Sequence, residues 1–550
     1  MEKDIIQCQT GMSHVLGNQK GRTNFSKPAF LLLLFFLLLV STATFSQKKE
    51  LPILNKDKIV GKNFVNGSDI EGVEHTFSDR IYKVFIDTTT NFLTVQLRGL
   101  KNDKWLSNTG KIVQYDIKSE KILWSRKIKY QTTYLQQFNK TMIYVTGDKS
   151  YCVDVKTGNN LWEVSNNIYF VDPVDNIGIG YKFKLSTGSS DDLEGINLKN
   201  GKIIWKRKLN REYGWNDLFY INDSTMIVVA AGLHAININT GKGWDYNAIT
   251  GKKDYSGTVA ANAAGVALGI LTGAFVMSTG YDLVRDVVSN CLVDSAFIYF
   301  ASKEQLVKIN KLSGKVVWEH PFSDDMASKS SLFMNDSTIY MINRGFAFMG
   351  YRQLDFGKPF IAAFDRQTGK QKYLTFTNAE KSKKSEKDPI LGYQVLGNEI
   401  YLVLKNKVVQ YHKETGNQIA EKTFSEENYG ELKYFVGSQV HINQDGKLLS
   451  LTQSDSTRVH VLTNNGKILP IDKQLNVAKT IDNEDISIYY LRTKDYKFIA
   501  KGEKTFIINN EGEKIAEVEA TSNAFLIENV LYDKRDKSFV AIDLKEIISE

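Results

Sequence analysis

The stretch NLKNGKIIW, residues 197–205, decides the fold of this chain of 550 residues. A strand-like apolar run leads into its polar turn, and an alternating segment that ends in tryptophan follows the turn. Asn can bond to nearby backbone groups in such a turn, and Gly supplies the positive φ that closes it. The segment after the glycine is typical of a return strand, whose large aromatic side chain can fill space against a neighbouring sheet.

The same hairpin recurs along the chain. Successive copies place an aromatic residue at the corresponding position, at Trp124, Trp162, Trp205, Trp244, Trp318 and Tyr373. Trp244 stands one position early relative to its turn glycine. Weaker copies surround Gly416, Gly466 and Gly512, and residues 539–544 resemble a partial copy. The chain is therefore a repeat protein, and the repeat defines its architecture.

A second hairpin signal lies upstream of the first in several copies, as in residues 221–228, 293–300 and 334–341. Two hairpins per repeat give four antiparallel strands. The turn glycines are 40 to 55 residues apart, except for one step of 73 residues between Gly241 and Gly314. Four strands about every 40–50 residues are typical of a β-propeller. We therefore predict an all-β fold of four-stranded blades.

The pattern apolar-Asp-x-x-Thr-Gly-Lys-x-x-Trp resembles the pyrroloquinoline-quinone-type (PQQ) repeat, the tryptophan-docking motif of quinoprotein-like propellers. The resemblance covers about residues 90–550 and is degenerate beyond Tyr373. It implies an eight-bladed ring in which each of the six aromatic residues locks one blade to the next. The chain carries about nine turn signals and a partial one. Either some copies are half-blades joined by ring closure, or the ring is larger than eight.

The PQQ-repeat family contains both enzymes and non-enzymatic proteins, so the site has to be argued separately. Its quinone-dependent dehydrogenases use adjacent cysteines, a calcium ion held by carboxylate and amide groups, and an Asp base. This chain has no Cys-Cys pair and no Cys-x-x-Cys-His sequence. Its histidines show no close metal-ligand spacing, and His234 is typical of a core or channel side chain. We predict no catalytic, cofactor-binding or metal-binding residue.

The charge pattern bears on nucleic-acid binding, and the cysteines bear on whether the chain contains a disulfide. Lys and Arg are scattered among Asp and Glu, and the formal charge of +8 is small for this length, so no nucleic-acid partner is predicted. Cys152 and Cys291 stand in apolar, strand-like surroundings. This setting favours two buried free thiols over a disulfide.

The N-terminus differs from the rest of the chain. Residues 29–40 are all apolar, basic residues precede them, and small residues follow near Ser46. This arrangement predicts a signal peptide over residues 1–46, with an uncleaved anchor as the alternative. Residues 47–89 form a lead-in that could close the ring, and the propeller occupies residues 90–550.

One long interval, residues 245–289, interrupts the repeat. No charged residue occurs in residues 255–281, which are rich in Ala and Gly. Gly265, Gly269 and Gly273 fall every four residues and would make one flat helix face that allows close packing. We predict a helical insertion packed against the propeller. The alternative is that this segment contacts a membrane or docks a partner.

These observations favour an exported, non-enzymatic propeller scaffold that binds an envelope protein or a surface ligand. The location would be the periplasm, the envelope or the exterior of a bacterium. In kind, the chain is most similar to the propeller lipoprotein of the outer-membrane β-barrel assembly machinery, but no lipidation cysteine follows its apolar run. Two alternatives are a quinoprotein-like oxidoreductase with its site in the central channel, and a sensor domain anchored by an uncleaved N-terminus.

Overall fold

The computed structural model describes most of the chain beyond the N-terminal segment. It covers residues 55–548 apart from residues 88–89, 91, 103, 131–132, 139, 147–148, 184–189, 210–214, 216, 231, 249–286, 324–325, 350–351, 378–387 and 445–446. The predicted signal peptide, residues 1–46, lies outside the described residues. The same holds for Gly265, Gly269 and Gly273 of the predicted insertion.

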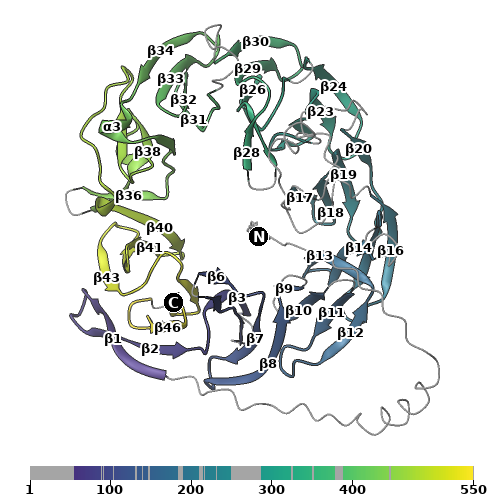
Figure 1. Cartoon of the computed structure of the whole chain (residues 1–550), viewed down its shortest axis with the longest axis vertical. Helices are drawn as coiled ribbons and strands as arrows, with labels where there is room; N and C mark the ends of the chain where they lie inside the picture. The colour runs from purple at the N-terminus through teal and green to yellow at the C-terminus, as the bar shows by residue number, and fades with distance from the viewer. Residues whose placement is uncertain are drawn as a thin grey trace.

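Antiparallel sheets follow one another in chain order around a ring (Figure 1). Each blade is a meander, and we name its strands A to D from the ring centre outward. The B and C strands are the most apolar and the most deeply buried, because they are covered by blades on both faces. The D strands alternate in burial, as β16 does over Ile203–Lys208, because they form the outer rim.

Blades 1 to 3 occupy residues 81–208. The strands of blade 1 are β3 Ile81–Asp87, β4 Phe92–Leu97, β7 Thr109–Asp116 and β8 Lys121–Lys129, with a small hairpin of β5 Leu100–Lys101 and β6 Trp105–Leu106 between β4 and β7. Those of blade 2 are β9 Thr133–Phe138, β10 Thr141–Thr146, β11 Lys149–Val153 and β12 Asn160–Val164. Those of blade 3 are β13 Asn166–Asp172, β14 Ile177–Lys182, β15 Asp192–Asn197 and β16.

Blades 4 to 6 occupy residues 217–376. The strands of blade 4 are β17 Asp217–Asn222, β18 Thr225–Val229, β19 Gly232–Asn237 and β20 Asp245–Asn247. Those of blade 5 are β21 Leu292–Val293, β22 Phe297–Ala301, β23 Gln305–Asn310 and β24 Val316–Pro321. Those of blade 6 are β25 Ser330–Met334, β26 Thr338–Asn343, β29 Phe360–Asp365 and β30 Gln371–Phe376, with the hairpin β27 Phe346–Met349 and β28 Arg352–Asp355 between β26 and β29.

Blades 7 and 8 are joined by a short helix, α3 Glu426–Tyr429. The strands of blade 7 are β31 Gly392–Leu396, β32 Glu399–Val403, β33 Lys407–His412 and β34 Gln418–Thr423. Those of blade 8 are β35 Leu432–Phe435, β38 Val459–Thr463 and β39 Ile468–Ile471. Between β35 and β38 lie β36 Val440–Gln444, β37 Lys447–Ser450 and α4 Leu451–Ser454. Residues 477–481 stand at the D position of blade 8 and touch β39 only through two isolated bridges.

Blades 9 and 10 share one sheet with the N-terminal hairpin. After the 3-10 turn η1 Asn483–Asp485, the strands of blade 9 are β40 Ile486–Arg492, β41 Tyr496–Lys501, β42 Lys504–Asn509 and β43 Lys514–Val518. Those of blade 10 are β44 Phe525–Ile527, β45 Val530–Lys534, β46 Ser538–Asp543 and, as the D strand, β2 Asp69–Thr76. The other strand of the hairpin, β1 Asn55–Asn63, pairs with β2 and also with β43.

The part of the chain that the structure describes therefore forms ten blades, where the family resemblance implied eight. Seven four-stranded sheets, one three-stranded sheet and the two blades of the shared sheet give this number. Ten hydrophobic clusters fill the spaces between successive blades, including the one between blade 10 and blade 1. The additional blades arise because the chain beyond Tyr373 continues to form one sheet after another, with three strands in the sheet of blade 8, and because the N-terminus supplies the D strand of blade 10.

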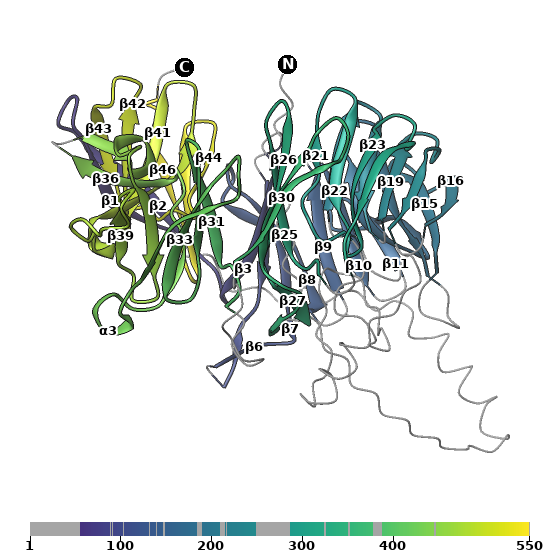
Figure 2. The same cartoon turned by 90° about the horizontal axis from the view of Figure 1, so that it is seen from above.

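The two faces of the ring carry different connections. The A–B and C–D connections lie on one side, the turn face, and the B–C and D–A connections on the other, the loop face. Figure 2 shows β6, β27 and α3 on the same side of the ring. The turn face has tight turns, with residues 436–458 of blade 8 as its long exception. Among the described residues, no helix is long and apolar enough to cross a membrane.

Candidate functional site

The six aromatic residues predicted from the repeat all lie at junctions between blades. Each ring covers the C–D turn glycine of the following blade, and a Cβ on that glycine would lie within 3.0 Å of the ring. The pairs are Trp124–Gly158, Trp162–Gly201, Trp205–Gly241, Trp244–Gly314, Trp318–Gly369 and Tyr373–Gly416. Each side chain also donates a hydrogen bond to the backbone carbonyl three residues before that glycine. These contacts support the blade-locking role that we assign to the six residues.

The early position of Trp244 has a structural cause. In blade 3, one extra residue of β16 forms a bulge between Ile203 and Trp205. The D strand of blade 4 is in regular register with β19, and the backbone N–H of Ala235 donates to the Trp244 carbonyl (2.9 Å). Because blade 4 lacks the bulge, it needs one residue fewer to bring its tryptophan to the same place.

One weak copy of the repeat is a different turn. The turn around Gly466 joins β38 to β39 and is a B–C connection. The C–D turn of blade 8 comes later, where the Asp472 side chain accepts from the backbone N–H of Asn476 (2.7 Å) and Leu475 has φ +59°. In the sequence, these turns are recognised by their glycines. This turn was therefore missed, because Leu475 takes the place of the glycine.

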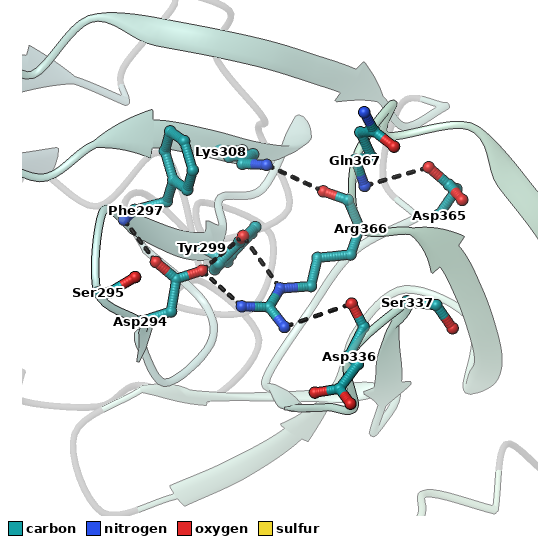
Figure 3. A pocket seen from close by; sticks show the side chains of 10 residues that line it. All are labelled: Asp294, Ser295, Phe297, Tyr299, Lys308, Asp336, Ser337, Asp365, Arg366 and Gln367. Carbon is teal, nitrogen blue, oxygen red and sulfur yellow. Dashed lines mark hydrogen bonds and ion pairs between the residues drawn. The ribbon is translucent and has the colours of Figure 1, made fainter.

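A cleft lies between blades 5 and 6 on the turn face (Figure 3). Its volume is about 420 Å³. Blade 5 contributes Asp294, Ser295, Phe297, Tyr299 and Lys308, and blade 6 contributes Asp336, Ser337, Asp365, Arg366 and Gln367. None of these residues was predicted from the sequence as part of a site.

Arg366 ties the two blades together inside this cleft. Its guanidinium donates to Asp294 Oδ2 (2.6 Å) through Nη2 and to the Tyr299 hydroxyl (3.2 Å) through Nε. The Tyr299 hydroxyl in turn donates to Asp294 Oδ2 (2.9 Å). Burial would raise the pKa of Asp294, but the Arg366 guanidinium and two backbone N–H groups of its own turn lower it to about 2. The carboxylate is therefore held ionised.

Lys308 is a cation in the interior of the same cleft, with only 6% of its surface exposed. Its Nζ donates to the Arg366 carbonyl (3.2 Å) and lies 4.2 Å from the centre of the Phe297 ring. Burial lowers the pKa of Lys308. The Arg366 carbonyl also accepts from Nε1 of Trp318 (3.3 Å). Lys308 and Arg366 thus stabilise the same junction between blades 5 and 6 that Trp318 closes. Their charges hold the two blades together.

His234 is buried in blade 4, as the sequence indicated, but it has a charged neighbour. Its Nδ1 lies 2.6 Å from Oδ1 of Asp245 on the adjacent strand, and Asp245 also pairs with Arg207 of blade 3. Burial would raise the pKa of Asp245, but His234 and Arg207 lower it. Since the acid is shared with Arg207 of blade 3, the group adds a charged contact to the junction that Trp205 closes between blades 3 and 4.

Of the cysteines that the structure describes, neither Cys152 nor Cys291 forms a disulfide, and Cys152 is buried. Burial raises the pKa of the Cys152 thiol to about 11, which makes it a poor nucleophile at neutral pH. Within the described ranges, no group of three or more His, Cys, Asp or Glu side chains is arranged to hold a metal ion. A second cleft of about 410 Å³ lies at the turn face of blades 9 and 10, with Asn63, Asp495 and Glu511 among its lining residues.

Comparison with known proteins fixes the family. The family described as "Outer membrane protein assembly factor BamB" matches residues 96–282 and 292–438, more than half of the chain. The chain belongs to this family. The match ends near the start of blade 8, where the tryptophan pattern has already faded. Among curated protein sequences, none matches the chain significantly.

Several solved structures are similar at low sequence identity. The crystal structure of BamB from Moraxella catarrhalis is 11% identical, with 74% of this chain and 96% of that chain covered and a TM-score of 0.31. Dihydro-heme d1 dehydrogenase NirN is 10% identical, with 74% and 76% covered and a TM-score of 0.30. Apo AztD from Citrobacter koseri is 11% identical, with 68% and 91% covered and a TM-score of 0.29.

Proposed function

We propose that this protein is an exported, non-enzymatic scaffold that binds another envelope protein through the loop face of its ring. The observation that carries the proposal is the asymmetry of the two faces. The hairpins β5–β6 and β27–β28 and the helix α3 all belong to the loop face. Connections that vary while the scaffold stays regular are where binding residues concentrate.

The chemistry of the described clefts supports the same proposal. Arg366 pairs with Asp294 of the neighbouring blade, and Lys308 donates to the Arg366 carbonyl. These charged groups therefore stabilise the junction between blades 5 and 6. Membership of the BamB family favours a scaffold, although PQQ-repeat proteins also include enzymes. A ring with a packed hydrophobic cluster at every described junction is a rigid support on which loops can be presented.

Site-specific photocrosslinking in cells tests the loop-face proposal. A photoreactive residue at Asn406 or Glu427, both exposed on the loop face, should give cross-links to one and the same envelope protein. The matched control is Val174, which is 71% exposed in the A–B turn of blade 3 on the turn face. Cross-links that are equally strong from Val174, or that come from Val174 alone, would contradict the loop-face assignment.

Two further measurements separate this proposal from its alternatives. The mature protein should begin at Gln47, whereas retention of residues 1–46 would favour the anchored sensor. Addition of pyrroloquinoline quinone with calcium should leave the unfolding temperature unchanged. A bound-cofactor absorption spectrum would instead support the oxidoreductase.

A further inference from the structure

The B–C connection of blade 1, residues 98–108, forms a narrow hairpin that we call the finger. Its strands β5 and β6 pair Leu100 with Leu106 and Lys101 with Trp105. Figure 2 shows β6 at the end of a projection from the loop face. No repeat signal accounts for the finger, since Thr146 already pairs with Lys149 at the corresponding ends of β10 and β11 in blade 2.

The base of the finger is firmly held. The Arg98 guanidinium packs against two aromatic rings that touch each other edge to face, 5.0 Å from the centre of Tyr82 and 4.7 Å from the centre of Tyr130. Its Nε donates to the Ser107 carbonyl, and the Ser107 N–H donates to the Gly99 carbonyl (2.8 Å). These contacts close the neck of the hairpin. The tip is therefore presented by a preorganised support, which lowers the entropic cost of binding.

The tip combines exposed apolar side chains with exposed lysines. Trp105 is 73% exposed and Leu106 is 46% exposed. Lys101 and Lys104 are also exposed. A tryptophan with most of its ring in water contributes little to folding, so its position at a projecting tip indicates a contact outside the chain.

The surroundings of the finger are basic as well. Residues 98–108 contain three basic residues and one acidic residue, a net charge of +2. Lys127 and Lys129 are exposed at the end of β8 on the same face, and Lys111 pairs across the strands with Lys127. Two acids lie nearby: Asp536 is paired with Arg80, and the Asp79 carboxylate lies beside Gly99 at the neck of the finger. The end of blade 1 therefore offers a positive surface around an aromatic tip.

This composition favours a lipid surface over a protein interface. Protein interfaces are enriched in Trp but depleted in Lys. Trp at the headgroup level with Lys beside it is instead typical of elements that bind a membrane surface, and each lysine adds attraction to anionic lipids. We propose that the finger docks the loop face of the ring onto an anionic bilayer surface, with Trp105 and Leu106 at the headgroup level and the lysines against lipid phosphates.

Vesicle binding tests this proposal without any partner protein, so its outcome is independent of the cross-linking experiment. Purified protein, with the same N-terminus in every variant, is mixed with phosphatidylcholine vesicles that contain or lack phosphatidylglycerol. Binding should require the anionic lipid and weaken with salt. Trp105→Ala should lower the apparent affinity about tenfold. The double variant Lys101→Glu/Lys104→Glu should lower it at least about 25-fold, from about fivefold per lysine.

A matched control lies on the other face of the same blade. Lys118 and Lys121 are exposed at the C–D turn of blade 1, and the variant Lys118→Glu/Lys121→Glu should change the affinity by no more than about twofold, because that turn faces away from the bilayer. Quenching of Trp105 by brominated lipids, taken as the difference from Trp105→Phe, should be present only with anionic vesicles. All variants should unfold at the temperature of the parent, since the substituted side chains are exposed.

Several outcomes would overturn the proposal. Equal binding of finger and control variants would mean that only net charge matters. Loss of binding only on deletion of residues 256–281 would place the lipid contact in the insertion. No vesicle binding, together with loss of the loop-face cross-links in Trp105→Ala, would make the finger a protein-docking element.

Discussion

The turn glycine of the repeat has a positive φ and is also covered by an aromatic ring. Replacing Gly241 by alanine, beside a matched control, separates the effects of these two features on stability. Gly241 has φ +69°, and a Cβ there would lie 2.5 Å from Cε3 of Trp205. Gly512, the C–D turn glycine of blade 9, has φ +88°, and nothing lies within 4 Å of its Cβ position. Gly512→Ala therefore reports the backbone conformation alone and is the matched control.

The expected effects differ by several kcal/mol. A side chain at positive φ costs about 1–2 kcal/mol, which is the whole effect expected for Gly512→Ala. At Gly241 the Trp205 ring must also move, which adds about 1–3 kcal/mol of overpacking, and its hydrogen bond to the Ile238 carbonyl (2.6 Å) weakens by about 1 kcal/mol. Gly241→Ala should thus lower the free energy of unfolding by about 3–6 kcal/mol.

Urea unfolding followed by far-ultraviolet circular dichroism measures both effects, and an unchanged slope shows that the transitions are comparable. Trp205→Ala alone should cost about 3–5 kcal/mol, since it empties a junction. In that background Gly241→Ala should cost only what Gly512→Ala costs, because the ring that it displaces is gone. Equal effects of the two glycine substitutions in the parent, or strict additivity in the double variant, would refute the docking argument.

Three other predictions concern the junctions and the closure of the ring. Tyr373→Phe removes the hydrogen bond to the Lys413 carbonyl (2.7 Å) and should lower the free energy of unfolding by about 1 kcal/mol; an unchanged urea midpoint would contradict it. The low pKa of Asp294 beside Arg366 stabilises the folded state by about 2 kcal/mol above pH 4, and this contribution is lost as the pH falls to about 2. The difference in stability between the parent and Asp294→Asn should therefore shrink over that range, and a constant difference would rule out this linkage. Truncation of residues 1–76 should lower the unfolding temperature and promote aggregation, because β43 and β46 would become open edges, whereas truncation of residues 1–50 should do neither.

The sequence predicted the blades well where the turn and the docking residue are close in the chain. The step from Gly201 to Trp205 fixes a hairpin and its aromatic contact within one short stretch. The count of blades was harder to obtain, because blades 7 to 10 have no tryptophan at the docking position and the last blade takes β2 from the other end of the chain. Pairing between strands that are hundreds of residues apart leaves no local pattern.

The charged junction of blades 5 and 6 was missed for a different reason. Lys308 stands in an alternating strand and is typical there of an outward side chain. Comparison between copies could have identified it, because the residue opposite the docking aromatic is Cys152 in blade 2, Gly195 in blade 3 and Ala363 in blade 6. A lysine at a position that is otherwise small or uncharged is a signal of a buried cation. Its partner Arg366 lies in another blade and could not be assigned from sequence alone.

The ring replaces the tryptophan contact by other means where the pattern fades. Ala420 of blade 7 stands at the docking position, and Leu475 stands at the glycine position of blade 8; both belong to one hydrophobic cluster. A small residue and a large one have thus exchanged places, which conserves the packed volume of the junction.

Beyond that point, backbone pairing joins the blades. β36 leaves blade 8 and pairs with β40 of blade 9, and the β1–β2 hairpin spans blades 9 and 10. At the glycine position of blade 1 stands Glu120, with φ +54°. The D strand of the preceding blade is β2, which has no tryptophan to cover this turn, so a side chain is accommodated there. Glycine is therefore required at this turn by the aromatic ring that covers it more than by the backbone conformation. For this reason Gly241→Ala and Gly512→Ala should differ.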